Sequence, residues 1–113
     1  MSNSINKYNP TLILSTKVSA DLISNRFLGF DGNYPAADSK SMGVVDAPWL
    51  LGELANVIVS GTAVVETDVA VALGDAITAG AGGKIKIAIA SEKINGYALT
   101  STSGAGFVTV LLK

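Results

Sequence analysis

The clearest pattern in the chain is an alternation of apolar and polar positions over residues 84–90. Ile85, Ile87 and Ile89 occupy one set of alternate positions, whereas Lys84 and Lys86 belong to the other. Successive side chains of a β-strand point to opposite faces of the sheet. The spacing therefore predicts a half-buried strand whose three isoleucines face a core.

Short runs rich in β-branched and aromatic residues predict further strands, each bounded by turn-forming residues. We expect these strands at residues 11–18, 27–30, 42–45, 54–60, 62–66, 76–78, 96–99 and 106–112. Gly61 interrupts one long apolar run, which indicates a β-bulge or a corner. Residues 19–24 fit either a helical turn or a loop, and residues 69–73 fit either a buried strand or a helical turn.

The chain lacks sustained helical patterning, since no segment keeps helical periodicity beyond about two turns. Roughly eight short strands separated by glycine-rich turns are typical of an all-β fold. The sequence therefore predicts a small single-domain β-barrel or sandwich with at most one or two helical turns.

A weak internal repeat links the two halves of the chain. Gly43 opens a short apolar phrase that is followed, after a loop, by Gly52 and a longer strand. Gly96, 53 positions after Gly43, opens a similar phrase that is followed by Gly104 or Gly106 and the last strand. Either two related β-hairpin units pair into one core, or two unrelated hairpins look alike.

The two parts of the chain differ in polarity. Residues 1–10 are polar, with asparagine at positions 3, 6 and 9, and we expect a flexible arm there. We expect residues 11–113 to form the folded domain. The N-terminus lacks the apolar segment of a signal peptide, and no apolar run reaches the roughly 18 residues of a membrane span. These features predict a soluble protein made in a cytoplasm.

Composition removes much of the common catalytic equipment. The 113 residues include no cysteine and no histidine, which excludes disulfides, thiolate metal sites and histidine bases. The formal charge of −1 is too small to attract nucleic acid or an anionic membrane. Charged residues make up only 15% of the chain. That low share indicates either a surface that meets another protein or a composition dominated by small alanines.

Three local motifs fail to provide chemistry. The glycine-rich segment before Lys84 resembles a phosphate-binding loop, but Thr78 and Ile85 stand where glycine and Ser or Thr are needed. Glu66 and Asp68 lack the further oxygen ligands of a calcium loop, and no histidine is present to activate a serine. We expect no catalytic residue, no metal, no cofactor and no enzymatic activity.

One loop carries large apolar side chains where polar residues are usual. It contains Pro48, Trp49, Leu50 and Leu51. Tryptophan is favoured at interface hot spots, so the loop is a candidate protein interface. The alternative is that the loop folds back and plugs an open end of the barrel.

The order of several phrases resembles that of the head decoration, or capsid cement, proteins of tailed bacteriophages. The resemblance covers residues 19–113 and rests on the order and spacing of the phrases. They are RFL at 26–28, MGVVDA at 42–47, GE at 52–53, VIVSG at 57–61, TAVVE at 62–66, LGDAIT at 73–78, the glycine-rich turn before position 84, GYAL at 96–99 and FVTVLL at 107–112.

This resemblance implies a β-rich, non-enzymatic protein that binds the outer surface of an assembled capsid. Family members clamp adjacent major capsid subunits against the pressure of packaged DNA, many of them as trimers over local threefold positions. By implication, this chain is a homotrimeric virion component made in the host cytoplasm. Its partner is then the major capsid protein, with no nucleic acid and no membrane.

The resemblance also implies an arm that orders on binding, which adds Ile5, Tyr8 and Pro10 to the candidate interface residues. The loop at 48–51 departs from the family, whose members tend to carry small residues there. Two alternatives stay open: another phage structural module, tail- or fibre-associated, and a small ligand-binding β-barrel.

Overall fold

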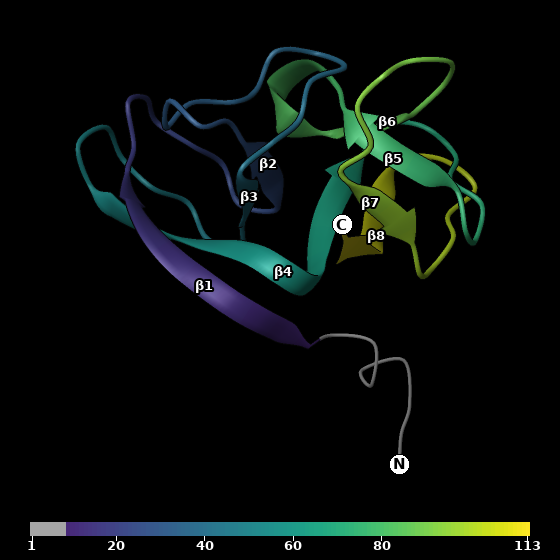
Figure 1. The fold of residues 1–113 in the computed structure, drawn as a ribbon, viewed down its shortest axis with the longest axis horizontal. Coiled ribbons are helices and arrows are strands. Elements are labelled where there is room, and N and C mark those ends of the chain that lie inside the picture. The colour runs from purple at the N-terminus through teal and green to yellow at the C-terminus, as the bar shows by residue number, and fades with distance from the viewer. Residues whose placement is uncertain (1–8) are drawn as a thin grey trace.

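The apolar runs of the sequence form β-strands in the computed structural model, which describes residues 9–113 (Figure 1). The short loops between them are rich in glycine, serine and aspartate, as turns require. The elements are β1 (Pro10–Lys17), β2 (Arg26–Leu28), β3 (Gly43–Val45), β4 (Leu54–Thr67), β5 (Ala76–Ala79), the 3₁₀ turn η2 (Ala81–Gly83), β6 (Ile85–Ile87), β7 (Gly96–Ala98) and β8 (Gly106–Leu112).

Five of the strands close into a barrel. Their hydrogen-bonded order is β4-β6-β5-β7-β8, and β8 returns to β4. The β4–β6 pair is parallel, and the other four pairs are antiparallel. The interior is packed with small and β-branched side chains, among them Ala63, Val65, Ile77, Val108 and Val110. The predicted all-β fold with a small barrel is thus confirmed.

The remaining strands extend the sheet beside the barrel. The first half of β4 pairs with β3 and β1, and β3 pairs with β2. This part covers a second apolar cluster made by Val18, Leu22, Leu28, Val45, Ala55 and Val57. Figure 1 shows β1 running along the first half of β4 at the outside of the molecule.

The long strand β4 serves both parts because it bends at Gly61. The Gly61 backbone has φ 88°, and a Cβ atom there would lie 2.4 Å from the carbonyl oxygen of Asn9. Before Gly61 the strand pairs with β1, and after it with β8. The break in the apolar run, for which the sequence left a β-bulge or a corner open, is thus a corner with irregular pairing to β1.

The pairing registers of the two halves correspond residue by residue. From Ile13 onward, residues of β1 and β2 have counterparts 49 positions later, and residues of β3 and of the first half of β4 have counterparts 53 positions later. Four sets of pairs show these offsets: Leu14–Val57 with Ala63–Val110, Lys17–Leu54 with Glu66–Phe107, Leu28–Gly43 with Ile77–Gly96, and the isolated bridges Leu22–Trp49 with Val71–Thr102.

These registers divide the domain into two equivalent units. Unit one comprises β1, β2, β3 and the first half of β4, whereas unit two comprises the second half of β4, β5, β7 and β8. The offset grows from 49 to 53 in the segment between the second and third strands, which in unit two contains β6. The β4 strand therefore joins two successive copies of one strand arrangement.

The strand predicted over residues 84–90 is shorter than expected. Ile85 is buried and Ile87 packs against the core, but β6 ends at Ile87. Ala90 has a positive φ of 52°, and the carboxylate of Glu92 accepts a hydrogen bond from the Ile89 amide at 2.9 Å. This turn leaves Ile89 exposed, so the prediction that all three isoleucines face a core is wrong for Ile89.

The boundary of the predicted N-terminal arm also needs correction. Strand β1 begins at Pro10, and Pro10 pairs with Gly61. The Asn9 carbonyl accepts a hydrogen bond from the Thr62 amide at 3.2 Å. The folded part thus begins before residue 11. Ile5 and Tyr8, the other arm residues expected at an interface, lie outside the described residues.

Both segments whose structure the sequence left open are loops. Residues 19–24 contain no helical turn, and Leu22 forms only an isolated bridge with Trp49. Residues 69–73 contain the equivalent bridge between Val71 and Thr102. Across residues 9–113, the structure has no helix of the length and hydropathy that crossing a bilayer requires.

Candidate interaction surface

The loop of residues 48–53 and the first residue of β4, Leu54, are here called the leucine loop, which presents three leucine side chains to solvent. The exposed fractions are 62% for Leu50, 65% for Leu51 and 66% for Leu54. Trp49 lies between this exposed tip and the interior, because its ring packs against the second apolar cluster. Trp49 also exchanges two backbone hydrogen bonds with Leu22, at 2.7 and 3.1 Å.

Hydrogen bonds hold the tip of the leucine loop in one conformation. The Leu50 amide donates to the Glu53 carboxylate at 2.6 Å, and the Leu51 amide donates to the Asp21 carboxylate at 2.9 Å. The Gly52 amide donates to the Val18 carbonyl at 2.9 Å. The leucines are therefore displayed on an ordered turn, which lowers the entropy lost when a partner covers them.

The two sequence interpretations of this loop apply to different residues. Trp49 packs inward against the second apolar cluster, which lies beside the five-stranded barrel, whereas the sequence alternative is a plug in an open end of the barrel. Pro48, Leu50 and Leu51 face solvent, and their role in an interface stays a prediction. Sequence reasoning missed Leu54, although its apolar side chain directly follows the polar Gly-Glu turn.

The Trp49 ring makes a testable contribution to stability. Its indole Nε1 is buried and has no hydrogen-bond partner within residues 9–113, and an unpaired buried donor costs about 1–3 kcal/mol. We expect Trp49→Phe to unfold at the same urea concentration as the wild type or a higher one. The loss of packing is offset because phenylalanine removes the unpaired donor. Trp49→Ala should lower the free energy of unfolding by about 2 kcal/mol, less than the same substitution of a fully buried tryptophan. A large loss in Trp49→Phe would show that the indole nitrogen has a partner.

Unit two carries an apolar side chain at the position equivalent to Leu54. Phe107 pairs with Glu66 as Leu54 pairs with Lys17, and both Phe107 and Leu54 are exposed. Leu73, in the loop that leads into β5, is exposed as well. Both units thus present apolar groups near the start of their last strand.

A second apolar surface follows strand β1. Leu12, Ile13 and Leu14 are 47%, 51% and 43% exposed. β1 pairs with β4 on one side, and no strand within residues 9–113 pairs with its other edge. An unpaired edge with consecutive apolar residues is a site where another chain adds on. Sequence reasoning predicted this strand but not its edge position.

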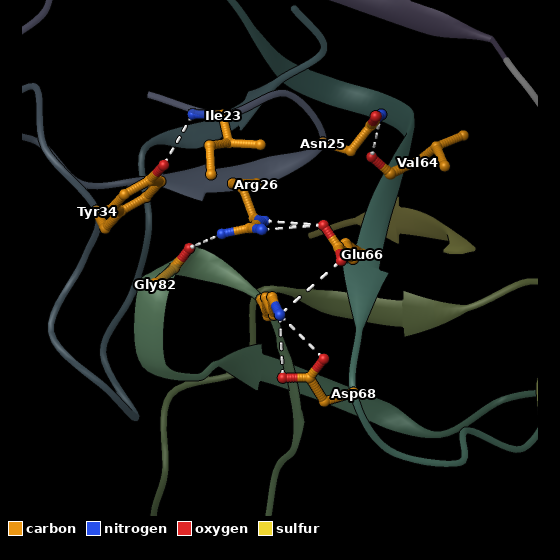
Figure 2. Close-up of polar contacts among 9 residues, drawn as sticks. Ile23, Asn25, Arg26, Tyr34, Val64, Glu66, Asp68 and Gly82 are labelled. Atoms are coloured by element: carbon orange, nitrogen blue, oxygen red, sulfur yellow. Dashed lines mark hydrogen bonds and ion pairs between the residues drawn. The ribbon is translucent and has the colours of Figure 1, made fainter. Parts of the chain in front are cut away.

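The charged residues around Arg26 neutralise one another (Figure 2). Arg26 donates from Nε and Nη2 to the Glu66 carboxylate at 3.2 and 3.0 Å, and from Nη1 to the Gly82 carbonyl at 3.0 Å. Lys84 lies 3.8 Å from the same carboxylate and 2.9 Å from that of Asp68. The network joins β2 of unit one to the second half of β4 in unit two. Its four charged side chains form ion pairs with one another.

Two lysines elsewhere have shifted pKa values without forming a site. Hydrogen bonds to Asp38 and Glu92 raise the pKa of Lys86, whereas burial lowers the pKa of Lys40. Lys40 borders a depression of about 280 Å³ lined by Phe30, Met42, Val59 and Leu112, among others. Its ammonium donates to the backbone carbonyls of Ile94 and Lys113. Over the described range, no three acidic side chains gather in a way that could hold a metal ion.

The large exposed apolar side chains named above gather at the leucine loop and along strand β1. The described part of the molecule is thus a small β-barrel domain with two apolar surfaces suited to association with other chains.

Comparisons with known proteins extend the description of the fold. No family model and no curated protein matches this sequence. Among solved structures, the chain is similar to the head fiber gp8.5 N base of bacteriophage phi29, with a TM-score of 0.76 and 16% sequence identity. The likeness covers 90% of this chain and 93% of that one. At this identity it shows that the two chains share a fold.

Proposed function

We propose that this chain is a non-enzymatic structural protein of a phage head that binds the outer surface of the capsid and stabilises it. The observation that carries the proposal is the shared fold with a head fiber base, which spans almost the whole chain. The order of sequence phrases resembling capsid cement proteins supports the same role independently. Its partner is the major capsid protein, and it acts as a homotrimer.

The leucine loop is the proposed contact with the capsid. The Leu50 and Leu51 amides are held by hydrogen bonds to Glu53 and Asp21, and Leu54 pairs with Lys17 of β1, so little order has to be gained on binding. One loop buries only a small area, but a trimer presents three loops to a repetitive shell. Linked weak contacts then add up by avidity.

A second candidate is that the domain is the attachment base of a head fibre. The observation that favours it is that the similar solved structure is itself the base of a head fiber. Both candidates require capsid binding. They differ in whether the bound domain reinforces the shell or only anchors a projecting structure.

Co-sedimentation with capsids tests the proposal. Purified protein is mixed with expanded, undecorated heads of the phage that encodes it, and bound copies are counted against protein concentration. We expect saturable binding at a stoichiometry that matches sites of the capsid lattice. Absence of binding to these heads would refute both the cement and the fibre-base functions.

Heat resistance of the same heads separates the two candidates. DNA-filled heads are warmed with and without bound protein, and DNA release is followed with a fluorescent dye. A cement protein should raise the release temperature, because it clamps neighbouring subunits. Binding without any change in release temperature would favour the fibre base.

A further inference from the structure

Strand β1 and the second half of β4 are equivalent strands in very different surroundings. Ile13 is 51% exposed, but its counterpart Thr62 is 7% exposed. Leu14 is 43% exposed, whereas its counterpart Ala63 is fully buried. The first strand of unit two is covered on both sides, whereas no strand of residues 9–113 pairs with the outer edge of the first strand of unit one.

The outer edge of β4 is covered by residues Asn25 and Arg26 of unit one (Figure 2). The Asn25 carbonyl accepts a hydrogen bond from the Glu66 amide at 2.9 Å, and its side chain donates to the Val64 carbonyl at 3.1 Å. Arg26 then pairs with the Glu66 carboxylate at 3.0 Å. Unit one thus caps the first strand of unit two through two residues and one ion pair.

The capping residues have counterparts in unit two, 49 positions later. Asn25 corresponds to Gly74, and both have a positive φ, 62° and 86°. Their amides make equivalent hydrogen bonds, Asn25 to the Val45 carbonyl at 2.7 Å and Gly74 to the Ala98 carbonyl at 2.8 Å. Gly74 therefore repeats the backbone conformation with which Asn25 covers β4. Unlike Asn25, Gly74 is exposed.

The charges of the capping ion pair are exchanged at the equivalent positions. Arg26 corresponds to Asp75, and Glu66 corresponds to Lys17. Lys17 is exposed, and no carboxylate of residues 9–113 lies within ion-pair distance of its ammonium. An Asp75–Lys17 pair would thus reproduce the Arg26–Glu66 pair with reversed polarity.

We propose that a second copy of this chain covers strand β1, placing its Gly74 and Asp75 against the outer edge as Asn25 and Arg26 cover β4. Asp75 of one copy then pairs with Lys17 of the next, and the outer edge of β1 is covered at Ser15 and Lys17, the counterparts of Val64 and Glu66. The two surfaces differ, so the interface is heterologous and closes into a ring when the rotation permits. This inference rests on the self-association included in the proposed function.

Charge reversal tests the interface on the purified chain without capsids. Sedimentation equilibrium and native mass spectrometry give the association constant of the wild type, Lys17→Glu, Asp75→Lys and the double variant. Each single reversal should weaken association at least about tenfold, because like charges then face each other. The double variant should restore most of the wild-type constant.

Conservative variants separate the ion pair from folding effects. The Asp75 carboxylate accepts a hydrogen bond from the Ala72 amide at 2.8 Å. Asp75→Asn can keep this bond while removing the charge, so it should weaken association and leave the unfolding midpoint unchanged. Lys93→Glu changes another exposed lysine and should not alter association.

Cross-linking identifies the neighbouring residues directly. A carbodiimide joins an ammonium and a carboxylate in contact, and a mixture of ¹⁵N-labelled and unlabelled chains shows whether the joined peptides come from different copies. We expect a Lys17–Asp75 link between labelled and unlabelled peptides. A chain that stays monomeric, or a double variant no tighter than the single ones, overturns this interface. A monomer that still binds capsids would overturn this interface alone, whereas an oligomer that does not bind them would overturn only the capsid function.

Discussion

Replacing Gly96 with alanine is expected to lower the free energy of unfolding by about 3 kcal/mol, the upper end for overpacked sites. A Cβ atom at Gly96 would lie 2.3 Å from the Leu111 carbonyl oxygen and 2.6 Å from Cγ1 of Val110. The first of these atoms is backbone of the neighbouring strand, so it cannot move without separating β7 from β8. Urea unfolding followed by circular dichroism should show a lower midpoint at an unchanged slope.

Gly43→Ala should have a similar effect, because Gly43 is the counterpart of Gly96 in unit one. Its Cβ atom would lie 2.3 Å from the Ile58 carbonyl oxygen and 2.8 Å from Cγ1 of Val57. Gly104→Ala is the matched control, since a Cβ atom at Gly104 would meet nothing within 4 Å. If Gly43→Ala or Gly96→Ala unfolds at the same urea concentration as Gly104→Ala, the close strand approach is wrong.

The β-strands could be predicted from the sequence because their information is local. Alternation and β-branched runs mark β4 and β8, and a glycine that interrupts an apolar run marks the corner at Gly61. The end of β6 could not be found this way, because the apolar alternation continues through Ile89. The turn there depends on Glu92 bonding to the Ile89 amide, a contact that no periodicity reveals.

The candidate surface was only partly accessible from the sequence, because exposure depends on which strand lies at an edge. Leu12–Leu14 and the apolar residues of β4 look alike in the sequence, yet the former are exposed and Val57 and Ile58 are buried. The leucine loop could be found because three large apolar residues follow Pro48. The inward position of Trp49 depends on the second apolar cluster, which forms only when β2, β3 and β4 come together.

The repeat illustrates how structure adds to a weak sequence signal. Gly43 and Gly96 share a residue type, but most other equivalent positions differ, such as Lys17 with Glu66 and Arg26 with Asp75. The two units are equivalent in the register of their strand pairs. This register tolerates changes of side chain as long as glycine is kept where two strands approach closely, at Gly43 and Gly96. The reversed charges then become informative, because they show which surfaces match.

The leucine loop should determine capsid affinity. Burying a leucine completely contributes about 2 kcal/mol, and about two-thirds of each side chain is exposed at Leu50 and Leu51. Leu50→Ser combined with Leu51→Ser should therefore remove about 2.6 kcal/mol per copy, a loss on the order of 100-fold in affinity. The measurement is the co-sedimentation isotherm on undecorated heads.

The double variant should fold normally, because its hydrogen bonds to Glu53 and Asp21 come from backbone amides that serine retains. Ile89→Ser is the matched control, since Ile89 is 65% exposed but lies on the turn after β6. It should bind capsids like the wild type. Equal capsid affinity of the double variant and this control would exclude the leucine loop as the contact and direct attention to another exposed surface of the barrel, such as Phe107 and Leu73.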